Sequence, residues 1–226
     1  MFIRSLLVIA WLAALVSSKI FARPATEDYV IEHIKATSEA LQNQINKLKP
    51  IIYKIGDEYQ GGIIFWVDHS GQHGLIMTKM DVGGKLQWQN GPDTRDFLNA
   101  SGNGIGAGDS NSHIIITKQT FYNSNENFAA LAAVNLSITT DGETICHLDH
   151  QPTSDCFAGW YLPSLYELNL IQTNLQSQGL GNFSSDYYWS STEINDEKVW
   201  AVNWGTGKQE SRDKGDEASI RPIRAF

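Results

Sequence analysis

The chain has 226 residues and carries 17 Lys and Arg against 25 Asp and Glu, so its formal net charge is −8 at pH 7. Such an acidic chain repels nucleic acids and anionic membranes, and most of the sequence lacks the Lys and Arg clusters that bind phosphates. From Lys198 onward the balance reverses locally, with six basic residues against four acids. The composition therefore argues against a nucleic-acid partner and directs attention to the C-terminal region for anion binding.

Residues 1–22 have the features of a secretory signal peptide. Arg4 precedes an apolar run, and small residues follow that allow cleavage after Ser18 or Ala22. The run is shorter than the ~18–20 apolar residues of a bilayer span, and an uncleaved N-terminal anchor is the alternative. Cleavage leaves 15 Lys and Arg against 25 Asp and Glu, a net charge of −10. We expect a secreted or cell-surface protein with no membrane span in the mature chain.

Residues 23–50 predict an amphipathic, coiled-coil-like helical stalk. Residues at alternating spacings of three and four form a heptad seam: Ile31, Ile34, Ser38, Leu41, Ile45 and Leu48. Thr26 is the expected N-cap, and Pro50 ends the helix. Because a lone helix of this length is marginal in water, residues 31–48 either join copies of the chain or fold back onto it. The Ile and Leu positions favour a dimer, although Ser38 weakens that inference.

Residues 51–226 predict one α+β domain of short strands and two main helices, large enough to bury a core. The segments "GGIIFWVD" and "GLIMTK" flank "HSGQH" as a hairpin, and "KVWAVNW" meets "KQES" across "GTG" as another. One helix is expected over roughly 117–133, and the second begins after Ser164. Ser164 and Glu167 have the spacing of a capping box, so Glu167 is interpreted as a cap rather than a catalytic carboxylate.

Cys146 and Cys156 are expected to form a disulfide, because export places them in an oxidising compartment. Two groups of residues offer alternative metal sites: His147, Asp149, His150 and Asp155 in the loop between the cysteines, and Asp68, His69 and His73 around the first hairpin turn. The cysteine loop matches no strong zinc spacing, and the hairpin group fits a surface turn. We therefore predict a disulfide and no metal.

The candidate catalytic groups have structural interpretations. The stretch "GIGAGDSNS" lacks the Lys-Ser/Thr of a P-loop and is interpreted as a tight loop. Ser190 and Ser191 lie in "YYWSSTE" without a nucleophile-elbow motif, and they are expected to alternate along a strand beside a buried Trp189. We predict no catalytic residue and no cofactor, and we do not expect an enzyme.

Two sets of residues are candidates for binding a polysaccharide. Trp200 and Trp204 are four apart on a predicted strand and share a face, so they form either a platform for a sugar or part of the core. The basic candidates offer charge-assisted donors to sulfate: Lys208, Arg212, Lys214, Arg221 and Arg224. In the alternative, this region is a solvated hairpin balanced by its own acids, and Arg221 or Arg224 is a structural ion pair.

Taken in order, residues 53–226 resemble the C-terminal domain of bacterial collagen-like adhesins, the Lcl C-terminal domain family. The resemblance is carried by Trp200 and the following segments: "YKIGDEYQGGIIFWVDHSGQHGLI", "GIGAGDSNS", "GWYLPSLYELNLI", "YYWSSTE" and "IRPIRAF". The "LPSLYEL" corner is also similar to an element of formylglycine-generating enzymes and related C-type-lectin-like folds.

The resemblance implies a C-type-lectin-like surface adhesin, often trimeric, that binds sulfated polysaccharides such as glycosaminoglycans. This chain departs from it because it has no Gly-X-Y collagen tract and its net charge is unfavourable for a polyanion. A structural or protein-binding surface module is the alternative function. An enzyme related to the formylglycine-generating enzymes is the third.

Overall fold

The structure is a computed structural model, which describes residues 27–48, 50–91, 96–121, 127–146 and 155–226. The chain divides into two compact units, one ending at Pro50 and the other running from Ile51 to Phe226. The predicted signal peptide and its anchor alternative, residues 1–22, lie outside the described residues. Within the described ranges, no helix has the length and apolar character that crossing a membrane requires.

The first unit contains one helix, α2 (Glu27–Leu48). Glu27 and Asp28 lie in its first turn and Lys47 in its last, which favours helix formation through the helix dipole. The predicted cap Thr26 lies outside the described residues. From Glu27 to Lys47 every side chain is exposed, including the apolar row of the predicted seam, of which Ile34 is 64% exposed.

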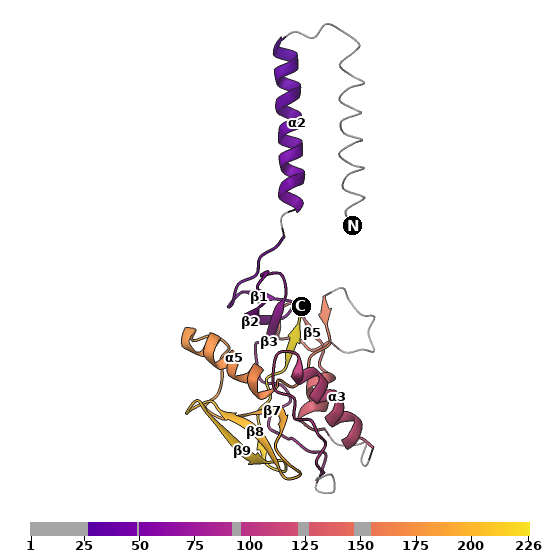
Figure 1. The fold of residues 1–226 in the computed structure, drawn as a ribbon, viewed down its shortest axis with the longest axis vertical. Helices are drawn as coiled ribbons and strands as arrows, with labels where there is room; N and C mark the ends of the chain where they lie inside the picture. The colour runs from indigo at the N-terminus through magenta and orange to yellow at the C-terminus, as the bar shows by residue number, and fades with distance from the viewer. Residues whose placement is uncertain (1–26, 49, 92–95, 122–126, 147–154) are drawn as a thin grey trace. The chain divides into compact units, whose positions relative to one another are not determined.

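The second unit is an α+β domain, as the sequence predicted (Figure 1). All strand pairs between its named strands are antiparallel. A four-stranded sheet has the order β1-β2-β3-β11, with bounds Glu58–Tyr59, Gly62–Val67, Gly74–Thr78 and Ile223–Ala225. A three-stranded sheet has the order β7-β8-β9, with bounds Tyr187–Glu193, Lys198–Asn203 and Lys208–Asp213. Two small pairs complete the strands: β4 (Leu86–Gln87) with β10 (Glu217–Ala218), and β5 (Ile138–Thr139) with β6 (Cys156–Phe157).

Both predicted hairpins are confirmed. In the first, β2 pairs with β3 around the "HSGQH" turn, and Val67 lies opposite Gly74. In the second, β8 pairs with β9 across "GTG", and Asn203 lies opposite Lys208. The C-terminal strand β11 then adds to β3, so the closing "IRPIRAF" segment joins the same sheet as the first hairpin.

The predicted helix over 117–133 is wrong in its bounds. Helix α3 spans Ala107–Gln119, so it begins inside the "GIGAGDSNS" stretch that was predicted to be a loop, and α4 spans Ala129–Val134. Gly106 is the N-cap of α3 and has a left-handed backbone with φ 78°. As a glycine it has no side chain to cap the helix. The first turn is instead held by the distant Glu167, an interaction that has no local sequence signal.

Helix α5 (Leu165–Leu175) begins as predicted. The Ser164 side chain accepts from the backbone N–H of Glu167, and the Glu167 side chain accepts from the N–H of Ser164, which completes the capping box. A short 3₁₀ turn, η2 (Gln176–Gln178), follows it. The inner face of α5 is buried against β2, β7 and β8.

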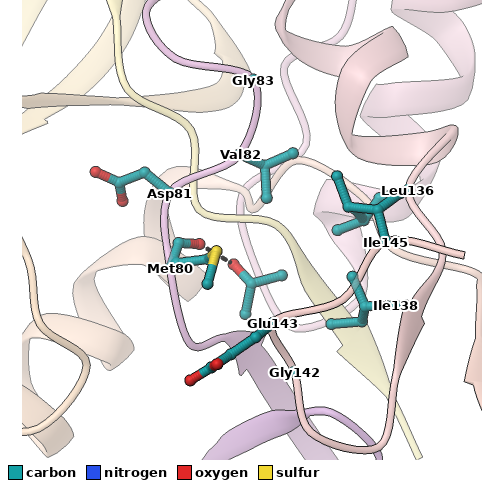
Figure 2. Close-up of a pocket in the computed structure, with 10 residues that line it drawn as sticks. Met80, Asp81, Val82, Gly83, Leu136, Ile138, Gly142, Glu143 and Ile145 are labelled. Atoms are coloured by element: carbon teal, nitrogen blue, oxygen red, sulfur yellow. Dashed lines mark hydrogen bonds between the residues drawn. The ribbon is translucent and has the colours of Figure 1, made fainter.

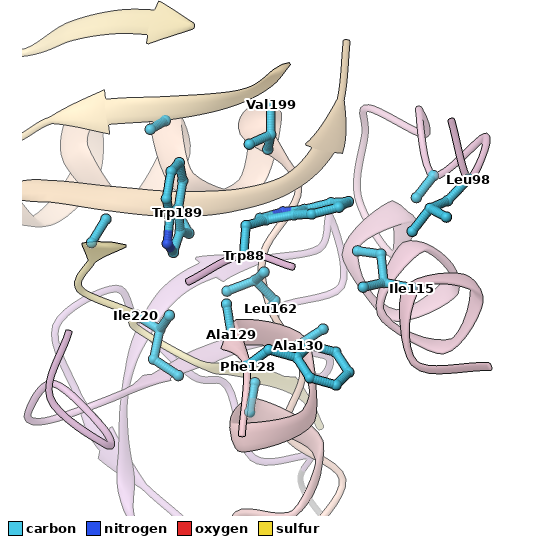
Figure 3. Packing of buried hydrophobic residues seen from close by; sticks show 14 residues of the cluster. Trp88, Leu98, Ile115, Phe128, Ala129, Ala130, Leu162, Trp189, Val199 and Ile220 are labelled. Atoms are coloured by element: carbon cyan, nitrogen blue, oxygen red, sulfur yellow. The ribbon is translucent and has the colours of Figure 1, made fainter. Parts of the chain in front are cut away.

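One buried apolar cluster lies among α3, α4, β7 and β8. Figure 3 shows Trp88 and Trp189 at its centre, between Val199 of β8 and the start of α4. Both indole N–H groups are satisfied: Trp88 donates to the Ser190 carbonyl at 2.9 Å and Trp189 to the Leu86 carbonyl at 2.8 Å. The two rings therefore bury their apolar area without leaving a polar group unpaired.

Candidate functional site

The carboxylate of Glu167 joins two motifs that are far apart in the sequence. It is fully buried and accepts the backbone N–H of Gly106 at 2.8 Å, of Gly108 at 3.1 Å and of Ser164 at 2.8 Å, together with the Tyr161 hydroxyl at 3.3 Å. Burial and the nearby Glu167 charge raise the pKa of Tyr161 far above its ordinary value. Glu167 thus fixes the start of both α5 and α3, and its oxygens are occupied by the fold.

The hydroxyl groups of "YYWSSTE" are also occupied. Ser190 Oγ donates to the Trp200 carbonyl at 2.6 Å, and Ser191 Oγ accepts from the Asn111 side chain at 3.2 Å. Thr192 Oγ1 donates to the Gly102 carbonyl and accepts from the N–H of Leu165. These three side chains lie on β7 and are buried, so the predicted strand beside a buried Trp189 is confirmed. Each hydroxyl stabilises a loop or a strand rather than facing an open site.

Lys214 does not face solvent, so we withdraw it from the predicted ligand contacts. Its side chain is 0% exposed, and its ammonium lies 2.5 Å from Glu193 Oε1 and donates to the Asp96 carbonyl at 2.9 Å. The Glu193 carboxylate also accepts the N–H groups of Leu98 and Ala100. The hairpin beyond β8 therefore turns this cation inward, where it neutralises a buried acid.

Arg221 is withdrawn for the same reason, and the alternative of a structural ion pair is the correct one. Its guanidinium is fully buried and donates to Asp81 Oδ1 through Nε at 2.9 Å and through Nη2 at 2.6 Å. Nη1 donates to three backbone carbonyls, and the Phe183 ring lies 4.1 Å from the guanidinium carbon. Arg221 thus ties the C-terminal segment to the end of β3.

The remaining cations of the β8–β9 hairpin are largely balanced by its own acids. Arg212 is half-buried, lies 2.9 Å from Asp216 and covers the Tyr187 ring at 4.2 Å. Lys198 lies 3.8 Å from Asp213. Lys208 is exposed, and no ion pair of its ammonium occurs within the part of the chain that the structure describes. These pairs favour the alternative of a hairpin balanced by its own acids over a concentrated basic patch.

The two tryptophans do not form an open platform. Trp204 is 4% exposed and stacks on Phe183 at a centroid distance of 3.9 Å. Trp200 is half-buried and packs against a second buried apolar cluster, which contains Trp204 and the inner face of α5. Both rings therefore belong mainly to the core, which is the alternative that the sequence left open.

Arg224 is the one predicted basic contact of the closing motif that reaches the surface. It is half-buried on β11, donates through Nη1 to the side-chain oxygen of Gln60, and lies 5.4 Å from the Phe157 ring centroid. Gln60 in turn donates to the Tyr59 hydroxyl at 3.1 Å. Burial lowers the pKa of Arg224, and Tyr59 opposes that effect.

Three aromatic rings pack beside this arginine. The Tyr59 ring lies 4.6 Å from Tyr53 and 5.0 Å from Phe226, and all three rings are half-buried. None of these rings, nor Gln60 or Phe157, was among the site residues predicted from the sequence. They come from segments far apart in the chain, and the sheet order β1-β2-β3-β11 brings most of them together. No local pattern could have grouped them.

A small apolar hollow of about 80 Å³ lies between the loop after β3 and the β5 region (Figure 2). Val82, Leu136, Ile138 and Ile145 gather around it, and Met80 at its rim is 43% exposed. Asp81 also lines the hollow, but its carboxylate already accepts from Arg221 and from the Tyr188 hydroxyl. The hollow is therefore apolar in character and large enough for one side chain.

The disulfide between Cys146 and Cys156 is confirmed. Of the alternative metal ligands in its loop, His147, Asp149 and His150 lie outside the described residues. Among the residues that are described, no three His, Cys, Asp or Glu are grouped as metal ligands would be. In the first hairpin turn, Asp68 accepts from the Ser70 hydroxyl at 2.7 Å, as expected of a surface turn.

Comparisons with known proteins leave the family open. No family model matches the chain, and no curated protein matches it. One solved structure that is similar is a fimbrial protein from Bacteroides ovatus, with 17% identity, a TM-score of 0.44, and coverage of 72% of this chain and 43% of that one. The chain thus spans less than half of that protein. Because a TM-score of 0.44 reflects partial overlap, this similarity assigns neither fold nor function, and membership in the Lcl family stays a prediction.

Proposed function

We propose that this chain is an exported surface module of the Lcl C-terminal type, which self-associates through α2 and binds polysaccharide through residues 51–226. One observation carries the proposal. Motifs of the resemblance that are far apart in the sequence are joined by buried hydrogen bonds, which we call the Glu167 frame. The Glu167 carboxylate accepts from the N–H groups of Gly106 and Gly108. The Thr192 hydroxyl donates to the Gly102 carbonyl and accepts from the N–H of Leu165. The motifs thus act as the scaffold of a shared fold, which supports family membership and leaves function to the surface.

The same contacts support a non-enzymatic role. The groups that an acid–base or nucleophilic mechanism would need are engaged inside the domain: Glu167, Glu193, Ser190, Ser191 and Lys214. A catalytic group has to reach substrate, and these side chains are all buried. Binding needs only polar and aromatic groups that reach the surface, such as the half-buried Arg224 and the half-buried rings near it.

Self-association is supported by the exposed apolar row of α2. Ile31, Ile34, Leu41 and Ile45 are all exposed, and a helix this short is marginal in water unless it packs. Packing against copies of the chain would bury this row in a dimer, which the Ile and Leu positions favour, or in a trimer, which the family resemblance favours.

Light scattering tests this assembly. The chain from Arg23 is expected to be a dimer or trimer, and the chain from Ile51 a monomer. Leu41→Asp places a charge in the seam and should dissociate the oligomer, whereas Ala36→Asp places the same charge on the opposite face and should leave it intact. A monomeric chain from Arg23 would contradict self-association through α2.

A glycan array that contains neutral, carboxylated and sulfated polysaccharides tests the ligand class. We expect binding to at least one polysaccharide, in contrast to a denatured sample of the same chain. Binding to sulfated chains should be weaker than a basic surface would give, because Lys214 and Arg221 are buried and Arg212 and Lys198 face acids. Silence on every glycan would contradict the proposal.

The apolar hollow favours a second candidate, a protein-binding surface module. Exposed Met80 and Ile145 beside the hollow could receive one apolar side chain of a partner protein. Cross-linking of the exported chain on intact cells, with Met80→Asp as the interfering variant, separates this function from glycan binding. Recovery of a partner that Met80→Asp loses, together with a silent glycan array, would favour it.

A further inference from the structure

The two arginines of "IRPIRAF" lie three positions apart and have opposite environments. Arg221 is buried, and its three nitrogen atoms donate to Asp81 and to backbone carbonyls. Arg224 has the same five N–H donors, but within the described ranges one acceptor, the side chain of Gln60, engages it, and it forms no ion pair there. Among the described residues no carboxylate compensates this half-buried guanidinium for the part of its hydration that it has lost.

The turn that presents Gln60 is built at an energetic cost. Tyr59 pairs with Gly62, so Gln60 and Gly61 form a two-residue hairpin turn, and their φ angles of 47° and 82° are both positive. Turns of this kind favour Asn, Asp or Gly at the first position, because a longer side chain is strained in the left-handed region. Gly61 is required there, since a Cβ would lie 2.6 Å from the Thr139 carbonyl. Gln60 is not required by the turn, and its amide instead bridges Arg224 and Tyr59.

One aromatic ring, that of Phe157, has its centroid 5.4 Å from the guanidinium carbon. On the Gln60 side, the amide connects the guanidinium to the Tyr59 hydroxyl, and the Tyr59 ring packs against Tyr53 and Phe226. We call these residues the Arg224 cluster: Tyr53, Tyr59, Gln60, Phe157, Arg224 and Phe226. A guanidinium fork suits a planar or tetrahedral oxyanion, and aromatic rings suit the apolar face of a sugar.

We propose that the Arg224 cluster binds an acidic sugar unit, with the carboxylate or sulfate of that unit on the Arg224 guanidinium and its ring against the neighbouring aromatics. This inference rests on the proposed polysaccharide-binding function and names its site and ligand chemistry. It also replaces the basic hairpin as the anion contact. One oriented guanidinium recognises one acidic group, which does not require the chain to be basic overall.

The test uses the full mature chain and four immobilised polymers: polygalacturonate for carboxylates, dextran sulfate for sulfates, unmodified dextran as the neutral arm, and polyglutamate as an acidic peptide. Arg224→Gln should reduce affinity for an acidic polysaccharide about 10-fold or more, the usual effect of losing a charge-assisted pair. Lys208→Gln removes an exposed charge elsewhere on the domain and should change the affinity by less than about 2-fold.

Two further variants separate binding from folding. Arg224→Lys keeps the charge but loses the fork, so it should bind more weakly than wild type and more tightly than Arg224→Gln. Gln60→Gly relieves the strained turn, so its melting temperature should equal or exceed that of wild type while its affinity falls. A purely structural Gln60 would instead leave the affinity unchanged. This variant keeps the test valid if Arg224→Gln fails to fold.

Several outcomes overturn the inference, and they are distinguishable from failure of the proposed function. Equal acidic-polysaccharide binding by wild type, Arg224→Gln and Gln60→Gly refutes the site but leaves the function standing, as does binding to neutral dextran alone. Silence on these polymers together with a positive glycan array refutes the site alone, and silence on both contradicts both. Binding to polyglutamate alone, lost in Arg224→Gln, would assign the cluster to peptide carboxylates and overturn the saccharide assignment.

Discussion

Removal of the buried ammonium of Lys214 is expected to destabilise the domain severely. In Lys214→Met the apolar stem is kept, but the Glu193 carboxylate loses the partner that lies 2.5 Å away and stays buried. Two backbone N–H groups, of Leu98 and Ala100, still donate to it and compensate only part of the charge. Breaking a buried pair from one side costs about 3–5 kcal/mol.

For a domain of this size each kcal/mol lowers the melting temperature by about 2–4 °C, so the expected decrease is about 6–20 °C. Thermal unfolding followed by circular dichroism, together with urea unfolding at constant pH, measures it. Lys208→Met is the matched control, because Lys208 is exposed at the start of β9, the strand that ends directly before Lys214. It should change the free energy of unfolding by no more than about 0.5 kcal/mol.

A double variant, Glu193→Gln with Lys214→Met, removes both charges and should recover much of the loss, because the neutral amide still accepts one of the two N–H groups. If Lys214→Met behaves like Lys208→Met, the ammonium reaches water and the buried-pair argument is wrong. If the double variant is no more stable than Lys214→Met alone, the cost does not come from an uncompensated charge.

Two other predictions concern the Glu167 frame. Gly108→Ala should cost about 1–3 kcal/mol in urea unfolding, because the new Cβ would lie 2.5 Å from Glu167 Oε2 and 2.7 Å from the Leu162 carbonyl. Gly104→Ala, in the segment just before α3, should be neutral because a Cβ there meets nothing within 4 Å. Equal losses in the two variants would contradict the packing argument. Burial raises the pKa of Tyr161 in the folded state above its ordinary value of 10.0, which applies to the unfolded chain. The contribution of the neutral Tyr161 side chain to the free energy of unfolding is therefore complete below pH 10. It decreases as the pH rises toward the folded-state pKa. The urea midpoint should therefore fall between about pH 9 and 11 in the wild type and fall less steeply in Tyr161→Phe, and parallel curves would refute this linkage.

Local chemistry explains the elements that were predictable. The capping box of α5 involves residues three apart, and each hairpin is made of neighbouring strands joined by a short turn, so a window of the sequence contains the interacting groups. The start of α3 was missed because the groups that hold its first turn, Gly106 and Gly108, bond to Glu167 about sixty positions away. The glycines around its first residues predict a loop when they are considered alone, and Gly106 does have a left-handed backbone.

The sequence by itself determined the α+β class, the two hairpins, the disulfide and the beginning of α5, because each depends on periodicity, on turn residues or on a pair of thiols. Only the tertiary structure decided which charges are available to a ligand. Lys214, Arg221 and Arg224 are all cations in the sequence, yet the first two pair with acids and the third meets the amide of Gln60 and the Phe157 ring. The reason is that desolvation and pairing depend on neighbours brought together by strand order, and these neighbours lie up to 164 positions away.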